Sequence, residues 1–139
     1  MGLTVLDASV VIAVLDAQDL HHAAARAGLA ARLAAGDSIV LPATAYAEAL
    51  VGPYRLGDAA VAIVDGFVEA LPAGLHPATA AIARTAARLR AQHGRRLPLP
   101  DAFVVATALE LSADRVLTCG GRWPALEISV DVARGQPGP

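Results

Sequence analysis

Short apolar runs alternate along this chain with longer segments that carry apolar residues at helical spacing. Runs of about four to eight apolar residues are typical of buried strands, and apolar positions three and four apart are typical of helices. The pattern predicts strands at 3–6, 38–41, 115–118 and 126–130, with a short extended piece around Leu75. It predicts helices at 8–15, 21–35, 44–51, 58–71, 77–93 and 101–112.

Strands that alternate with helices predict an α/β fold, in which helices cover both faces of a mostly parallel central sheet of four to five strands. The length of 139 residues suits one domain, expected at 1–131, followed by a flexible C-terminal tail at 132–139. Gly52 and Pro53 are expected to stop the helix at 44–51, and two prolines are expected to keep 94–100 out of any helix.

Three apolar segments each contain a single charged residue, and in each case it is an acid. Asp7 is alone between residues 1 and 15, Glu48 between 38 and 54, and Asp101 between 97 and 109. Placing an ionised carboxylate in apolar surroundings costs on the order of several kcal/mol of folding free energy unless something neutralises it. The chain has no lysine, and no arginine lies within these segments. A divalent cation with hard oxygen ligands, Mg²⁺ or Mn²⁺, would neutralise all three acids, whereas no His/Cys cluster supports zinc.

Each acid also has a simpler interpretation. Asp7 could cap the helix that begins at residue 8, and Asp101, directly after Pro100, could cap its own helix. Glu48 lies within a predicted helix and could be an ordinary surface residue. The same context recurs in three distant segments, which favours one shared metal site over three unrelated roles. Because ligands bind at the carboxyl ends of strands in open α/β sheets, Asp7 and the segment after Thr118 are where such a site is expected.

The bulk composition limits the possible function classes. The net charge is −2, so contacts to nucleic acid would have to come from a local basic patch. Candidates are Arg84 and Arg88, four apart on one predicted helix, and Arg95 and Arg96 after it, although a solvated helix face explains them equally well. Without lysine, neither a Walker-type P-loop nor a Schiff-base mechanism is possible.

Hydropathy and cysteine usage predict the compartment. Mean hydropathy is +0.51, but the apolar runs are far shorter than the ~18 residues of a membrane span. No basic leader precedes an apolar stretch, so no signal peptide is expected. The single cysteine, Cys119, cannot form an internal disulfide, and together these features predict a cytoplasmic protein with no membrane partner.

The segments around the three acids resemble the motifs of PIN-domain nucleases, and their order and spacing are similar to those of VapC toxins. The matching stretches are VLDASVVIA, TAYAEAL, LPLPDAFVVATAL and ADRVLTCGGRWPAL, within a resemblance that runs from residue 3 to about 130. The resemblance implies a PIN-like three-layer α/β/α sandwich. It also implies a Mg²⁺-dependent endoribonuclease toxin, in which Mn²⁺ can substitute, that cuts RNA such as tRNA or rRNA. A homodimer and a cognate antitoxin that blocks the active site are implied as partners.

Carried over by position, the resemblance assigns the catalytic and metal-binding roles to Asp7, Glu48 and Asp101, and supporting hydroxyls to Ser9 and Thr118. Ser9 also argues against a haloacid-dehalogenase-like phosphatase, which needs a second Asp at that position.

One position departs from the family. A fourth acid usually follows the threonine of the last motif by two residues, and here that position is Gly120. Loss of one carboxylate predicts weaker metal affinity. It also leaves open a degenerate PIN-like binding module with weak or no nuclease activity. Trp123, in the same segment, is expected to be a core residue rather than an RNA-stacking one.

Overall fold

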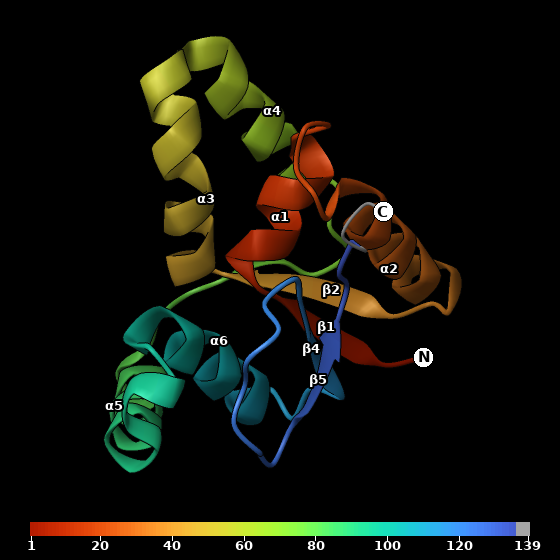
Figure 1. The fold of residues 1–139 in the computed structure, drawn as a ribbon. Helices are drawn as coiled ribbons and strands as arrows, with labels where there is room; N and C mark the ends of the chain where they lie inside the picture. The colour runs from red at the N-terminus through yellow and green to blue at the C-terminus, as the bar shows by residue number, and fades with distance from the viewer. Residues whose placement is uncertain (136–139) are drawn as a thin grey trace.

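The central feature of the fold is a five-stranded sheet in which all neighbouring strands are parallel. The structure is a computed structural model that describes residues 1–135. The strands follow the order β3-β2-β1-β4-β5 (Figure 1). They are β1 (Leu3–Leu6), β2 (Ser38–Pro42), β3 (Gly74–His76), β4 (Arg115–Thr118) and β5 (Ser129–Val132).

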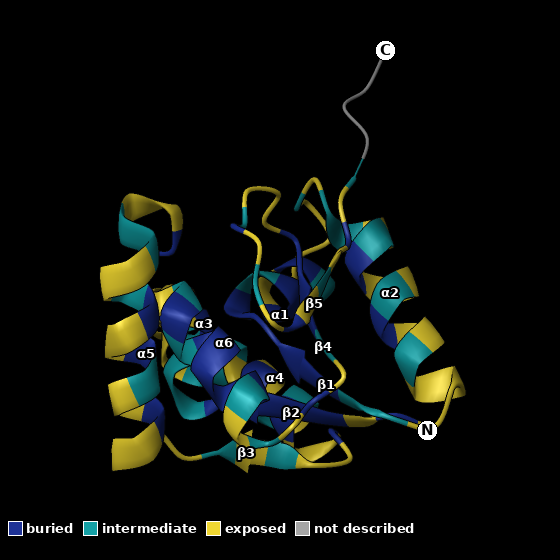
Figure 2. Ribbon diagram, turned by 90° about the horizontal axis from the view of Figure 1, so that it is seen from below, coloured by how far each residue is buried: buried dark blue, intermediate teal, exposed yellow. Residues whose placement is uncertain are grey.

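Helices cover both faces of this sheet. On one face α6 contacts β1, β2 and β4, and α5 packs on the outside of α6; on the other, α1 and α2 contact β4, and α4 contacts β3. Figure 2 shows that β1, β2 and β4 are largely buried between these helices. The predicted three-layer α/β/α sandwich is therefore confirmed, with a sheet that is entirely parallel. The helices are α1 (Ala8–Leu15), α2 (His22–Ala34), α3 (Ala43–Leu56), α4 (Asp58–Glu69), α5 (Ala80–His93), α6 (Leu99–Glu110) and the 3₁₀ turn η1 (Gly94–Arg96).

Proline was a poorer guide to helix ends than expected. The prediction that α3 stops at Gly52 and Pro53 is wrong, because the helix runs on to Leu56 and ends before Gly57, whose φ is 124°. Pro53 lies in the last turn, where its missing N–H removes only one helical hydrogen bond. The prediction that 94–100 is non-helical is also wrong in part.

That segment contains η1 and then the start of α6. Pro98 occupies the N-cap position of α6, and Pro100 is its second residue. The first N–H groups of a helix have no partner within it, so proline is tolerated there. The site acid Asp101 is thereby the third residue of α6 rather than its first.

The C-terminal strand begins later than predicted and runs further. β5 starts at Ser129 rather than 126 and ends at Val132, and the N–H of Ala133 donates to the Thr118 carbonyl at 2.7 Å. Residues 132–135 therefore pack on the domain. Residues 136–139, the rest of the tail predicted from 132, lie outside the described residues.

The direction in which successive strands are added to the sheet reverses beside β1, which is called a topological switch point. From β1 the chain proceeds to β2 and β3 on one side and then returns to β4 on the other. The carboxyl ends of β1 and β4 are joined there, since the N–H of Asp7 donates to the Leu117 carbonyl at 3.0 Å. Ligands of open α/β folds bind in the crevice at such a point.

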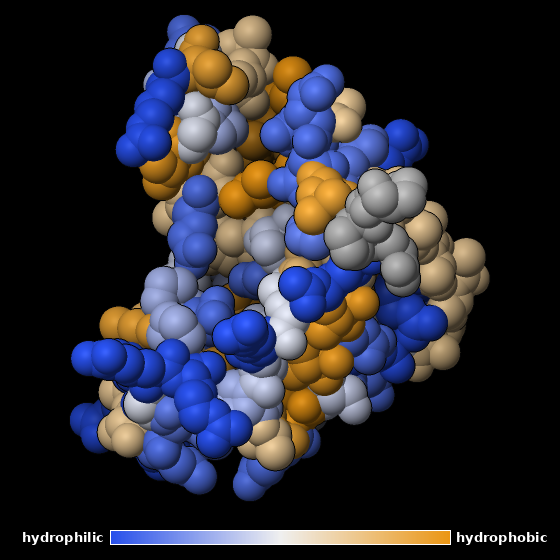
Figure 3. Space-filling view, viewed as in Figure 1, coloured by the Kyte–Doolittle hydropathy of each residue, from blue (hydrophilic) through white to orange (hydrophobic). Residues whose placement is uncertain are grey.

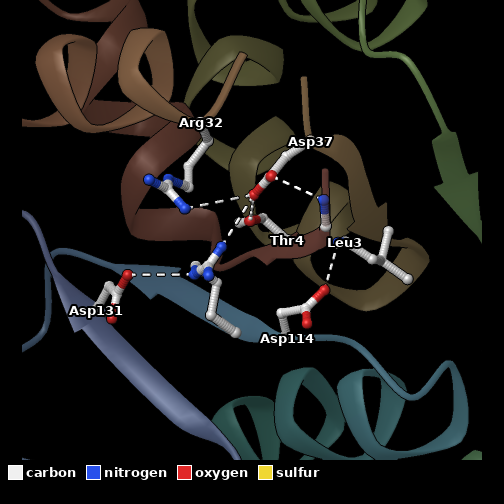
Figure 4. A network of polar contacts seen from close by, with 8 residues as sticks. Leu3, Thr4, Arg32, Asp37, Asp114 and Asp131 are labelled. Carbon is white, nitrogen blue, oxygen red and sulfur yellow. Dashed lines mark hydrogen bonds and ion pairs between the residues drawn. The ribbon is translucent and has the colours of Figure 1, made fainter. Parts of the chain in front are cut away.

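The opposite, amino-terminal edge of the sheet holds a structural charge network centred on buried Asp37 (Figure 4). Its carboxylate accepts hydrogen bonds from the Gly2 N–H at 3.0 Å, Thr4 Oγ1 at 2.9 Å and Arg115 Nη1 at 3.0 Å. Arg32 lies 3.6 Å away. These partners belong to the N-terminal residues, β1, β4 and α2, so one carboxylate ties four segments together.

Asp37→Asn is expected to lower the melting temperature by several degrees at pH 7. The hydrogen bond from Arg115, followed by that from Thr4, lowers the pKa of Asp37 below its ordinary value of 3.8. The stabilisation is therefore fully present above pH 3.8 and is lost as the pH falls through the lower folded pKa. Thermal unfolding followed by circular dichroism from pH 7 to pH 2.5 would show the difference between wild type and variant shrinking at the acid end. Asp131→Asn is the matched control, because Asp131 pairs with the same arginine from an exposed position. Equal melting temperatures of wild type and Asp37→Asn at pH 7 would contradict the prediction.

Candidate functional site

Asp7 lies at the carboxyl end of β1, in the N-cap position of α1, with extended backbone angles of −81° and 153°. Its side chain forms no capping hydrogen bond. Instead Oδ2 accepts hydrogen bonds from Ser9 Oγ at 2.6 Å and from Thr118 Oγ1 at 2.8 Å. The alternative that Asp7 serves as a helix cap is therefore wrong, because its carboxylate turns toward the end of β4.

The two hydroxyls that hold Asp7 are themselves fixed by the loop after β4. Ser9 Oγ accepts from the N–H of Cys119 at 3.0 Å, and Thr118 Oγ1 accepts from the N–H of Gly120 at 3.0 Å. Each hydroxyl thus has its proton directed at Asp7. Oδ1 of Asp7 receives no hydrogen bond from any residue among 1–135, so one oxygen is held and the other remains available.

Asp101 lies in the first turn of α6, where the helix dipole favours a negative charge. Its side chain makes no capping hydrogen bond either, and the N-cap position belongs to Pro98. Burial, and secondarily the charge of Asp7, raise the pKa of Asp101 from 3.8 to about 6. The cost of desolvation and repulsion therefore exceeds the help from the dipole.

Glu48 lies on the second turn of α3, the helix that follows directly from β2. Its side chain is exposed, as the surface interpretation expected. Partial burial raises its pKa, and the charges of Asp7 and then Asp101 raise it further. Three acids that are far apart in sequence thus lie close enough to repel one another at the carboxyl edge of the sheet.

The three carboxylates have the donor chemistry of a hard divalent cation but do not form a closed cage. None takes part in an ion pair within residues 1–135. Over the same part of the chain, no three His, Cys, Asp or Glu side chains converge closely enough to hold one metal ion. Mg²⁺ is usually bound by one or two carboxylates and keeps several of its waters. The site fits a cation of that kind, with buried Asp7 and half-buried Asp101 as the inner pair and Glu48 at its exposed margin.

The place of the missing fourth acid is taken up by Trp123. A Cβ built at Gly120 would lie 3.3 Å from Trp123 Nε1 and 3.4 Å from Thr118 Oγ1. The indole N–H donates to the Gly120 carbonyl at 3.1 Å, which holds the ring against this glycine. Asp131, which follows in β5, contacts Arg115 at 3.4 Å instead of approaching Asp7. Glycine at 120 therefore accompanies a tryptophan that is packed over it.

The sequence profile of the PIN domain family matches residues 4–128 of the chain. The chain belongs to the PIN domain family. No curated protein matches the sequence significantly. Among solved structures the fold is similar to Mycobacterium tuberculosis VapC20, a sarcin–ricin-loop-cleaving toxin, with a TM-score of 0.66 and 19% identity over 81% of this chain and 86% of that one.

Two further solved structures have a similar fold. FitAcB from Neisseria gonorrhoeae gives a TM-score of 0.69 and 22% identity, covering 91% of this chain and 95% of that one. VapBC-1 from nontypeable Haemophilus influenzae gives a TM-score of 0.62 and 18% identity, covering 84% of this chain and 85% of that one. At these identities the comparison concerns the fold alone.

In this PIN domain two of the four predicted arginines lie beside the acids. Arg95 and Arg96 line a hollow of about 420 Å³ that also contains Asp101. Arg88 lines a different hollow, together with Glu127, and Arg84 is exposed on α5. Strongly hydrophilic side chains gather over α5 and the turn that follows it (Figure 3).

Sequence reasoning missed two residues of the hollow that contains Asp101. Arg122 was not singled out at all, and Trp123 was assigned to the core; the structure packs Trp123 partly on the core and also places it in the wall of this hollow. Their position was the available signal, because both lie in the loop that follows a strand at the carboxyl edge.

An apolar groove of about 570 Å³ runs between α1, α3 and α4 of the PIN domain. Ile12, Leu56 and Ile63 line it and are 44%, 83% and 59% exposed. Glu48 lies in its wall, so the groove leads to the acidic cluster. No helix within residues 1–135 is long and apolar enough to cross a membrane.

Proposed function

We propose that this PIN domain is a Mg²⁺- or Mn²⁺-dependent endoribonuclease that acts in the cytoplasm as the toxin of a toxin–antitoxin pair. The observation that carries the proposal is the group of three acids at the sheet's switch point, which have no ion-pair partners within residues 1–135. Burial and then the charge of Asp7 raise the pKa of both Glu48 and Asp101. Structural similarity to VapC20, a toxin that cleaves the sarcin–ricin loop, supports structured RNA as the substrate class.

The chain's own residues divide the work of phosphodiester hydrolysis. When bound, the cation would polarise the phosphate and lower the pKa of water. Asp7 and Asp101 would hold it, with Asp7 pre-oriented by the hydroxyls of Ser9 and Thr118. Glu48 is exposed and its pKa is raised toward the working range of a general base, so it would accept the proton of the attacking water. The water oxygen forms the new bond to phosphorus as the P–O bond to the leaving ribose oxygen breaks. That oxygen keeps the electron pair of the broken bond and takes up a proton from solvent.

Cleavage of RNA by the purified chain should depend wholly on a divalent cation. Incubation with tRNA and ribosomal RNA in Mg²⁺ or Mn²⁺ is expected to give discrete fragments on denaturing gels, and excess EDTA is expected to stop their formation. Restoration of activity when Mg²⁺ is added back would exclude simple inactivation by the chelator. Equal cleavage with and without EDTA would contradict the proposed mechanism.

The degenerate binding module stays as a second candidate because of Gly120, where a fourth carboxylate is absent and Trp123 fills the space. Calorimetric titration with Mn²⁺ separates the two candidates. A nuclease of the proposed kind has a metal site that is lost in Asp7→Asn, whereas a pure binding module shows no heat that depends on Asp7.

We propose further that an antitoxin covers the apolar groove between α1, α3 and α4 and thereby reaches Glu48. The solved relatives include the FitAB and VapBC complexes, which supports a partner of this kind. Burial of the exposed apolar residues in that groove would supply the driving force. We also propose that the free toxin is a homodimer, as the resemblance implies. Light scattering would give its molar mass and so distinguish a dimer from a monomer.

A further inference from the structure

The hollow beside Asp101 carries an inference that deepens the proposed function and rests on it. Three arginines line this hollow: Arg95 and Arg96 from η1, and Arg122 from the loop after β4. No carboxylate among residues 1–135 pairs with any of the three. Asp101 is the one acid that lines it, so three guanidinium groups face one carboxylate.

Trp123 adds a flat aromatic wall to the same hollow. One end of the indole is fixed, because its N–H donates to the Gly120 carbonyl at 3.1 Å, and the ring is only partly buried against the core. A ring that is held in place and still partly open to solvent gives a base something to stack on without further loss of side-chain freedom. Glycine at 120 lets the ring lie this close, since a Cβ there would be 3.3 Å from Nε1 and a larger side chain would require the ring to move.

We infer that the hollow is a nucleotide subsite that binds one unpaired nucleotide of the RNA next to the bond to be cut, with the base stacked on Trp123 and the flanking phosphates on Arg95, Arg96 and Arg122. Its volume of about 420 Å³ lies within the range of ~300–1,000 Å³ for small-ligand sites. Proteins that recognise unpaired RNA commonly combine stacking on aromatic rings with arginine contacts to the backbone. A paired base cannot stack on the ring, so the subsite favours loops and bulges over regular duplex.

The chain contains one tryptophan, so fluorescence excited at wavelengths that only tryptophan absorbs reports on Trp123 alone. The test is a fluorescence titration of the full chain in EDTA, so that binding is measured without turnover. The probes are a five-nucleotide oligoadenylate, an abasic strand of the same length that lacks all five bases, and a duplex probe in which the same five adenines are paired within the stem of a longer, stable hairpin. Saturable quenching is expected with the single strand. The abasic strand and the duplex are expected to bind at least about tenfold more weakly, because each loses one base–aromatic stack.

Two sets of variants separate the base contact from the phosphate contact. Trp123→Leu is expected to bind oligoadenylate about tenfold more weakly, measured by polarisation of a labelled strand, and to bind the abasic strand as the wild type does. Trp123→Phe keeps a ring and should retain most of the preference for the intact base. Arg122→Ala, and Arg95→Ala with Arg96→Ala, should weaken both strands and reduce the slope of log affinity against log salt by about 0.7 per arginine.

The wild-type comparison of intact and abasic strands needs no variant, so it decides the inference even where a tryptophan variant folds poorly. Equal affinity for the two strands, or binding with no change in fluorescence, would overturn the subsite. A DNA strand that binds like the RNA strand would support it and would place sugar recognition elsewhere. Base-dependent quenching in a chain that fails to cleave RNA would keep the subsite and reject the nuclease. If Trp123→Leu cleaves RNA with unchanged KM and site preference, the subsite is rejected and the proposed nuclease function is kept.

Discussion

Asp7→Asn is expected to reduce the rate of RNA cleavage by about 10²- to 10⁴-fold, in line with the several kcal/mol that a metal contributes to charge stabilisation in the transition state. The substitution preserves shape and has a specific effect on the two oxygens. The amide oxygen can still accept from Ser9 Oγ and Thr118 Oγ1, which now bond to Oδ2. The amide NH₂ then replaces Oδ1, the oxygen that is free of hydrogen bonds within the described chain. A donor without negative charge therefore stands where a cation needs an acceptor.

Initial rates on an end-labelled RNA in saturating Mg²⁺ would measure this loss, with circular dichroism to show that the fold is kept. Asp131→Asn is the matched control, because it makes the same chemical change at an exposed acid that contacts Arg115 instead of the acidic cluster. Its cleavage rate should stay within about twofold of wild type. A comparable rate for Asp7→Asn and Asp131→Asn would remove Asp7 from the mechanism.

The position of the acidic cluster was predictable because the carboxyl ends of parallel strands meet at one edge. Asp7 was recognisable as the residue after an apolar strand, and Thr118 as the last residue of another. Their direct hydrogen bond follows from the pairing of β1 with β4, which periodicity alone does not specify. Glu48 was recognisable only by its isolation from other charges, and its position within a helix left open the surface location that the structure has.

Features that depend on how loops fold back were not predictable. The loop after β4 brings Arg122 and Trp123 against Asp101, which comes earlier in the chain on α6. Asp37 lies between α2 and β2, where it is buried and accepts hydrogen bonds from Thr4 and Arg115 of two different strands. A local pattern describes propensity and periodicity, whereas these contacts depend on strand order and on the path of a loop.

Asp101→Asn is expected to stabilise the metal-free protein at neutral pH while it removes metal binding. In the folded chain the pKa of Asp101 is raised from 3.8 to about 6, first by burial and then by the charge of Asp7. The folded state therefore binds the proton more tightly than the unfolded state, so the stability of wild type falls as the pH rises from about 4 to about 6. Above pH 6 the full penalty of the buried charge applies. A shift of this size corresponds to roughly 1–2 kcal/mol after allowance for partial exposure and salt.

Thermal unfolding in EDTA should therefore give Asp101→Asn a higher melting temperature than wild type at pH 7.5, with the difference closing toward pH 4. Adding Mg²⁺ or Mn²⁺ should raise the melting temperature of wild type and leave the variant unchanged, since only a state that binds the ligand is stabilised by it. Glu127→Gln, at an exposed position in the loop before β5, is the control for loss of one negative charge and should behave as wild type in both tests. A variant that is less stable than wild type at pH 7.5 in EDTA would mean that Asp101 has a structural role. A variant that is more stable than wild type there would mean that the fold tolerates a destabilising carboxylate in the first turn of α6. The helix dipole offsets part of its cost, and a bound cation would offset the rest.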